Sequence, residues 1–243
     1  TGLFDGDMEI ALSTELGSVS LLGGYFPDLE ALYIEAGFPL GPVDFAIGYG
    51  SDGKDPFYAG GDSGIVNLSF GGSKDIKITD DYSYDGATLA KSKNSKHRLL
   101  YLSPVLKQDI HLSGLSSLTI RVASSKKAAN LSVWLVSLPW NNNPKAKITE
   151  NIITRGWADI QNYKSLNESS DLIPDKFYTM SFDLQPDDQV IKKGQQIGLM
   201  IFSSDQEFTL HPKPGTILTV DLNSTSLKLP VVGGLRSYIK ATR

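Results

Sequence analysis

One tetrad in this 243-residue chain has the residue types of a covalent catalyst. Gly61-Asp62-Ser63-Gly64 reads GDSG, the sequence that surrounds the nucleophilic serine in chymotrypsin-like proteases. That chemistry needs a histidine base and a buried aspartate. Both come earlier in the chain in those proteases, whereas no histidine here precedes His97. The G-x-S-x-G turn of α/β-hydrolases is absent as well. We therefore expect no catalytic residue in this chain.

Metal-ligating residue types are few and poorly spaced. Neither His97 nor His211 has a second histidine or a carboxylate at the spacing of a zinc site. The absence of cysteine excludes disulfides, thiolate zinc sites and a cysteine nucleophile. The acidic pairs Asp80-Asp81 and Asp187-Asp188 could bind Ca²⁺ together with loop carbonyls, although such aspartates are more commonly turn formers. We expect neither a metal nor another cofactor.

An aromatic residue followed by amides has the chemistry of a carbohydrate site. Trp140 is followed by Asn141, Asn142 and Asn143, and sugar recognition typically uses exposed aromatics beside amides and carboxylates. Runs of asparagine are also good turn formers. Trp140, Asn141 and Asn142 are therefore candidate sugar-binding residues, with a plain turn as the alternative.

The composition is ordinary for a globular protein, with 40% hydrophobic and 21% charged residues and a net charge of −4. This mild acidic balance gives no reason to expect nucleic acid or an anionic membrane as a partner. Because no apolar run reaches about 18 residues, we expect no transmembrane helix. The bacterial cytoplasm and the cell envelope both remain open as locations, and so does a homo-oligomer. The chain begins at Thr1 rather than Met, which is typical of a fragment or a processed product.

The elements that must position these residues are predicted to be strands. The 23 glycines and 12 prolines interrupt segments that alternate apolar and polar residues, a pattern typical of an all-β sandwich. Asp28–Glu35 can be read as a short helix or as a strand. The expected strands are Arg98–Leu102, Ile110–Leu112, Ser117–Ala123, Leu131–Leu138, Ile148–Gly156, Tyr178–Leu184, Gln195–Ser203, Thr216–Asp221 and Leu227–Val232.

The chain divides into three predicted parts. The first fifty residues carry a weak 24-residue repeat of turns and strands, and residues 1–71 are expected to form a β-hairpin meander. The glycine-rich and serine-rich stretch at 50–75 marks a boundary. Residues 72–235 are expected to form the main β-sandwich, a jelly roll. Residues 236–243 form a tail.

A series of sequence blocks carries a family resemblance. The blocks are DDYSYDGATLA (80–90), HRLLYLSPVL (97–106), AANLSVWLVSLPW (128–140), ITRGWADIQN (153–162), FYTMSFDLQPDDQVIKKGQQIGLMIFSSD (177–205), FTLHPKPGT (208–216) and LPVVGG (229–234). In order and spacing, residues 80–234 resemble the C-terminal non-catalytic β-sandwich domain of X-prolyl dipeptidyl peptidases, cocaine esterase and related acyl hydrolases.

The resemblance implies an accessory role beside a partner domain. In such enzymes an α/β-hydrolase domain, missing from this chain, carries the serine, aspartate and histidine, and the galactose-binding-like sandwich packs against it and walls the substrate pocket. Arg155, Trp157, Asp187 and Asp188 are then the expected contact residues, because tryptophan and arginine are enriched in interface hot spots. For Trp157, the alternative is an aromatic ring that seals the edge of the core. A free-standing carbohydrate-binding or extracellular assembly module is the alternative function.

Overall fold

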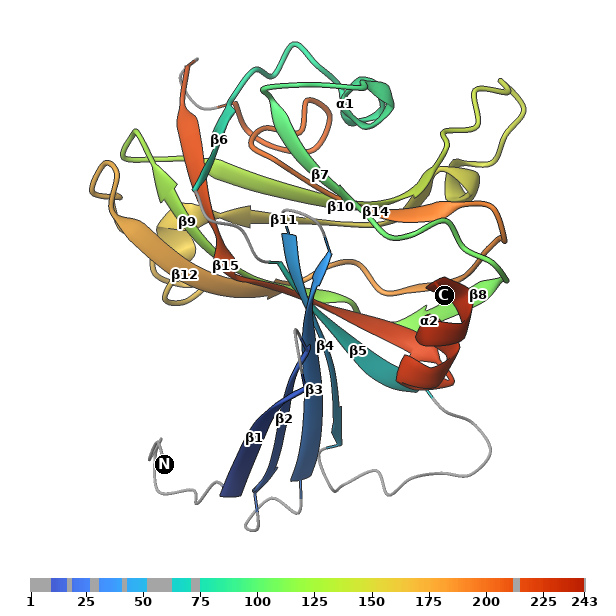
Figure 1. The fold of residues 1–243 in the computed structure, drawn as a ribbon. Helices are drawn as coiled ribbons and strands as arrows, with labels where there is room; N and C mark the ends of the chain where they lie inside the picture. The colour runs from blue at the N-terminus through green and yellow to red at the C-terminus, as the bar shows by residue number, and fades with distance from the viewer. Residues whose placement is uncertain are drawn as a thin grey trace.

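The computed structural model describes residues 10–16, 19–26, 31–40, 43–51, 63–70, 75–211 and 215–242, and the two sheets of these residues pack face to face (Figure 1). The larger sheet has eleven strands: β1 (Ile10–Leu16), β2 (Val19–Phe26), β3 (Ala31–Leu40), β4 (Val43–Ser51), β5 (Ser63–Phe70), β6 (Ile76–Thr79), β8 (Ile110–Gly114), β9 (Ser117–Ser124), β12 (Phe177–Asp183), β13 (Asp187–Ile191) and β15 (Ile217–Val232). The smaller sheet has the order β11 (Ile152–Asp159), β10 (Asn130–Leu138), β14 (Gln196–Phe202), β7 (Arg98–Leu102). The all-β sandwich is therefore confirmed, whereas the jelly-roll and galactose-binding-like assignments stay predictions.

The first five strands form the expected meander, since each pairs antiparallel with the next. β3 covers Ala31–Leu40, so the ambiguous segment around 28–35 is a strand where it is described. β5 also pairs antiparallel with β15, from Ser63 opposite Val232 to Phe70 opposite Thr225. Hydrogen bonds thus continue the sheet across residue 71, where the sequence predicts a domain boundary, and β1–β4 project from the sandwich (Figure 1).

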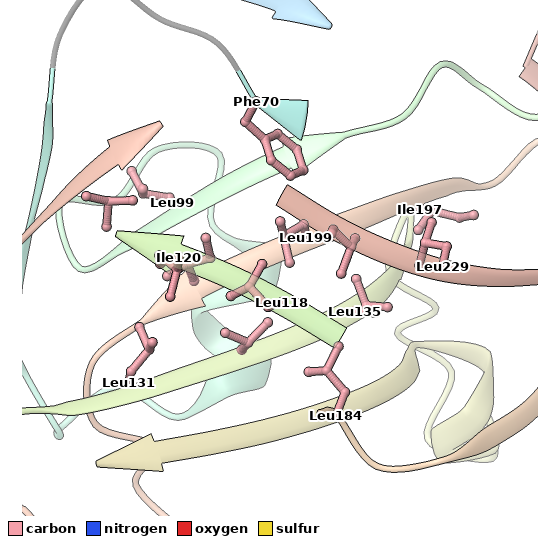
Figure 2. Close-up of a cluster of buried hydrophobic side chains, with 14 of the residues drawn as sticks. Phe70, Leu99, Leu118, Ile120, Leu131, Leu135, Leu184, Ile197, Leu199 and Leu229 are labelled. Carbon is pink, nitrogen blue, oxygen red and sulfur yellow. The ribbon is translucent and has the colours of Figure 1, made fainter. Parts of the chain in front are cut away.

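The main core lies between the two sheets. Inward-facing side chains of β9, such as Leu118 and Ile120, are fully buried, as are Leu131 and Leu135 of β10. Figure 2 shows these residues gathered in one cluster with Phe70, Leu99, Leu184, Ile197, Leu199 and Leu229. Burying one such side chain contributes roughly 1.5–3 kcal/mol, so this layer dominates the stability of the sandwich.

A second apolar cluster covers the outer face of the smaller sheet. Trp134 and Val136 of β10 pack there with Met200, Phe202 and with Leu89 of helix α1 (Gly86–Lys91). The strand expected at 131–138 is therefore central in its sheet and buried on both faces. Helix α1 fits because Gly86 has no side chain: a Cβ there would lie 2.3 Å from Cη2 of Trp134.

The C-terminal tail contains a helix that completes the core. Helix α2 (Gly234–Thr242) buries Tyr238 and Ala241 in the main cluster. The carbonyl of Ala241 accepts a hydrogen bond of 2.7 Å from the backbone N–H of Lys107. Most of the predicted tail at 236–243 is therefore packed against the sandwich.

Three predicted elements were wrong in detail. Ile148–Glu150 is a 3₁₀ turn, called η2, because Glu150 Oε1 accepts a hydrogen bond from the N–H of Lys147, and the strand begins only at Ile152. Asp187 and Asp188 begin strand β13 instead of forming a turn, since they pair with Gly114 and Ser113 of β8. The two strands expected at 216–221 and 227–232 are one strand, β15, whose pairing with β9 shifts between Asp221 and Ser226. A second 3₁₀ turn, η3 (Ile160–Asn162), follows β11.

Across the described part of the chain, no helix is long and apolar enough to cross a membrane.

Candidate functional site

Strand β11 is an edge strand of the smaller sheet, and a crossing segment covers its open side. The N–H of Gln185 donates to the carbonyl of Arg155 at 2.7 Å, and Thr154 Oγ1 donates to the carbonyl of Gln185 at 2.5 Å. Gly156 permits this approach, because a Cβ on it would lie 3.1 Å from Cα of Leu184. The ITRGW block therefore builds an edge that is already hydrogen-bonded, which protects it from pairing with other chains.

A buried aspartate joins two tryptophans on the outer face of this sheet. Asp205 follows β14 and is 1% exposed. Its Oδ2 accepts hydrogen bonds from the indole Nε1 of Trp134 at 2.8 Å and of Trp157 at 2.9 Å. These tryptophans lie on the neighbouring strands β10 and β11, where Trp134 is directly opposite Arg155. One carboxyl oxygen thus satisfies two donors that would otherwise lose their hydrogen bonds to water.

Arg155 and Phe208 complete this arrangement, which we call the Asp205 cluster: Trp134, Arg155, Trp157, Asp205 and Phe208. The guanidinium of Arg155 lies 4.8 Å from the ring centroid of Trp134 and 4.9 Å from that of Phe208. The ring of Phe208 stacks on Trp157, with centroids 5.0 Å apart. Cation–π contacts of this kind contribute roughly 0.5–2 kcal/mol. The cluster therefore holds one cation and three aromatic side chains together beside the sheet edge.

The loop that carries Phe208 is held by hydrogen bonds at several points. The carbonyl of Asp205 accepts from the N–H groups of Phe208 at 3.1 Å and Thr209 at 3.0 Å. Thr209 Oγ1 accepts from the N–H of Asp205, and Asn130 Nδ2 donates to the carbonyl of Leu210. The loop is thereby fixed, although Leu210 is 89% exposed and Phe208 is 50% exposed.

The two predicted contact aspartates lie on the other sheet. Asp188 Oδ1 accepts a hydrogen bond of 2.6 Å from His111 Nε2, and the hydrogen bonds from His111 and Ser113 lower the pKa of the Asp188 carboxyl. Burial raises the pKa of Asp187, whose Oδ2 is buried without a hydrogen-bond partner. Because the Asp188 side chain is 72% exposed, this ion pair contributes little to stability. Arg155 and Trp157 are thus brought together by the fold, and Asp187 and Asp188 form a separate charged edge.

The candidate sugar-binding loop is occupied by its own hydrogen bonds. Asn141 donates its backbone N–H to Asn151 Oδ1 at 2.6 Å and its Nδ2 to Glu150 Oε2 at 2.7 Å. Trp140 is partly buried against the outer-face cluster, and Asn142 is exposed. These contacts build the turn that the sequence offered as the alternative, and sugar binding by Trp140, Asn141 and Asn142 stays a prediction.

Other chemistry-bearing residues are placed as follows. Ser63 and Gly64 of the GDSG tetrad belong to strand β5, while Gly61 and Asp62 lie outside the described residues. Asp81 accepts hydrogen bonds from both the N–H and the Oγ of Ser83, which lower the pKa of its carboxyl and close a turn. Within the residues that the structure describes, no group of three or more histidine or acidic side chains could hold a metal.

Sequence reasoning found Arg155 and Trp157 but missed Trp134, Asp205 and Phe208 as their partners. One signal was available, because Trp134 lies inside a strand buried on both faces and its indole N–H therefore needs an acceptor. An aspartate directly after a buried strand, as in FSSD at 202–205, offers one. Nothing in the sequence joins the two residues, which are 71 positions apart.

Comparison with known proteins places the sandwich in a described family. Residues 71–240 match the family model of the X-Pro dipeptidyl-peptidase C-terminal non-catalytic domain. A protein of Rhodopirellula baltica named as an Xaa-Pro dipeptidyl-peptidase is 60% identical over 157 residues, which cover 65% of this chain and 25% of that protein. A similarly named protein of Bacillus anthracis is 36% identical over 166 residues, 68% of this chain and 26% of its own length. The chain therefore spans about a quarter of the length of these relatives.

Solved structures are similar in fold. An aminopeptidase from a marine sediment thaumarchaeote matches with a TM-score of 0.50 at 12% identity, over 67% of this chain and 35% of its own. An α-amino acid ester hydrolase matches with a TM-score of 0.50 at 11% identity, over 66% of this chain and 33% of the hydrolase chain. At these identities the likeness shows the fold alone.

Proposed function

Because the chain belongs to the family of X-Pro dipeptidyl-peptidase C-terminal non-catalytic domains, we propose that its sandwich packs on a catalytic α/β-hydrolase domain and shapes access to the substrate pocket. The relatives named as Xaa-Pro dipeptidyl-peptidases are about four times as long as the matched region. A domain of this kind contributes surface and rigidity, whereas the reacting groups belong to its partner.

The Asp205 cluster is the observation that carries the proposal. It fixes Arg155 and Trp157 at a sheet edge through the buried Asp205. Contact energy in protein interfaces is concentrated in such ordered arginine and tryptophan side chains, because little conformational entropy is lost when they bind. Asp187 and Asp188, at the edge of the larger sheet, are proposed as a second contact with the polar character of an interface rim.

The sequence lacks the motif that would support hydrolysis by this chain alone, since G-x-S-x-G does not occur in it. We expect the purified chain of residues 1–243 to give no turnover of Ala-Pro-p-nitroanilide or of simple acyl esters. Turnover that a serine-reactive inhibitor abolishes would contradict an accessory role.

A domain exchange tests the accessory role directly. The matched C-terminal quarter of the Rhodopirellula baltica relative is replaced by residues 71–240 of this chain, and Ala-Pro-p-nitroanilide hydrolysis is compared between this chimera, the unmodified relative and the relative without that quarter. At 60% identity over 157 residues, we expect the chimera to keep activity within about tenfold of the relative, a difference of about 1.4 kcal/mol. Activity no higher than that of the shortened protein would overturn the proposal. In the same assay, changes at Asp187 and Asp188 test the second contact.

A further inference from the structure

Arg155 and Trp157 are each only partly exposed. The guanidinium of Arg155 lies between the rings of Trp134 and Phe208. The only side-chain donor of Trp157, its indole N–H, is hydrogen-bonded to Asp205, and Phe208 stacks on the indole ring. The loop that carries Phe208 therefore covers part of the surface over both residues.

That surface is apolar and exposed. Phe208 is 50% exposed and Leu210, in the same loop, is 89% exposed. A leucine this exposed on a loop fixed at Asp205, Thr209 and the carbonyl of Leu210 is ready to bind without further ordering. Phe208 and Leu210 lie two positions apart on this loop, and neighbouring exposed apolar side chains mark interaction sites when they form a patch.

The loop continues into a second ring stack. His211 lies 4.5 Å from Tyr82 between ring centroids, with ring planes 6° apart, and Tyr82 is 39% exposed. The Tyr82 segment is tied to the loop from inside, because Ser204 donates its N–H to the buried Asp80 at 2.8 Å. We call these four side chains, Tyr82, Phe208, Leu210 and His211, the aromatic ridge.

We propose that the aromatic ridge, with Leu210 at its most exposed point, is the anchor that inserts into an apolar recess of the catalytic domain of the same enzyme. This inference rests on the proposed function and changes which residues make the contact: Arg155 and Trp157 support the ridge from below. Two observations support the catalytic domain as the partner of the ridge. The ridge is continuous with the Asp205 cluster through the Phe208 stack, and the relatives contain three quarters of their length outside the matched domain.

The test uses the chimera with two matched substitutions. Leu210→Ser removes the exposed leucine of the ridge, and Leu166→Ser removes a leucine that is 92% exposed in another loop. Because both side chains are solvated in the isolated domain, neither change is expected to alter the thermal midpoint of the 1–243 chain. In the chimera, we expect Leu210→Ser to speed thermal loss of activity about tenfold, since anchor residues contribute about 1.4 kcal/mol or more. Leu166→Ser is expected to leave that rate unchanged.

The outcomes separate the two proposals. An active chimera that is indifferent to Leu210→Ser, or equally sensitive to Leu166→Ser, would overturn the role of the ridge and leave the accessory function standing. An inactive chimera would overturn both. Phe208→Ser provides a second variant, expected to act in the same direction as Leu210→Ser in the chimera. Because Phe208 also stacks on Trp157, its effect counts for docking only where it exceeds the effect on the isolated 1–243 chain.

Discussion

The indole Nε1 of Trp157 and the Oδ2 of Asp205 lie 2.9 Å apart and join an edge strand to the loop that follows β14. The same oxygen also accepts from Trp134 on the neighbouring strand. This shared acceptor links the sheet, the aromatic rings and the exposed loop. Removing the Asp205 carboxylate is therefore expected to disturb the aromatic ridge as well as the two tryptophans.

Substituting Asp205 by alanine is expected to destabilise the chain by about 3 kcal/mol. The change leaves two indole N–H groups without an acceptor, and each buried unsatisfied donor costs roughly 1–3 kcal/mol. Urea unfolding of the 1–243 chain, followed by tryptophan fluorescence, measures the free energy of unfolding. Asp205→Asn is the control. It keeps one side-chain oxygen as an acceptor, so its free energy of unfolding should fall clearly less than that of Asp205→Ala. Equal losses for both variants would show that the shared acceptor is not what matters.

Substituting Gly156 by alanine is expected to cost about 2 kcal/mol, in the range found for overpacked sites. The added Cβ would lie 2.8 Å from Cδ2 of Leu184 and 3.2 Å from the carbonyl oxygen of Asp183. Because the second contact is with backbone, shortening Leu184 to alanine should not rescue the variant. A double-mutant cycle in urea checks this, and full rescue by Leu184→Ala would contradict the account.

Tyr101 and Tyr178 should respond oppositely to loss of their hydroxyl groups. The hydroxyl of Tyr101 is buried without a partner, so Tyr101→Phe is expected to raise the free energy of unfolding by up to about 1 kcal/mol. Tyr178 accepts a hydrogen bond of 2.9 Å from the N–H of Ile173, so Tyr178→Phe should lower it by about 1 kcal/mol. Thermal or urea unfolding at neutral pH compares the pair, and destabilisation by both would be inconsistent with an unsatisfied Tyr101.

The stability of the chain is expected to fall in alkali. Burial raises the pKa of Tyr101 from 10.0 to about 12, and likewise that of Tyr238. The neutral phenols therefore contribute stability that is fully present below pH 10 and is lost as pH rises towards 12. Tyr101→Phe should make this loss shallower between pH 10 and pH 12. An unchanged pH profile would mean that the Tyr101 phenol ionises as easily in the folded chain as in the unfolded one.

Alternation along the chain predicted most of the sandwich. Strands such as 98–102 and 131–138 were confirmed nearly to the residue, because both their periodicity and their bounding turn residues are local features. Asp187 and Asp188 were assigned to a turn from their residue type, but pairing with β8, whose His111 bonds to Asp188, holds them in a strand. Such pairing is tertiary and leaves no local signal.

The candidate site was predictable only in part for the same reason. The ITRGW block drew attention to Arg155 and Trp157, but their partner Asp205 lies 48 residues beyond Trp157. The exposure of Leu210 was also hidden, since FTLH reads as a short apolar stretch that could equally be buried. Contacts between distant segments decided both cases.

Amide hydrogen exchange tests docking through the aromatic ridge most directly. Exchange of residues 205–211 is compared between the isolated 1–243 chain and the chimera with the remaining three quarters of the Rhodopirellula baltica relative, with residues 165–168 as an internal reference. We expect exchange at 205–211 to slow by about tenfold or more in the chimera, because docking adds to the free energy of local opening. Residues 165–168 should exchange equally in both. Equal exchange of 205–211 in the two proteins would contradict docking through this loop.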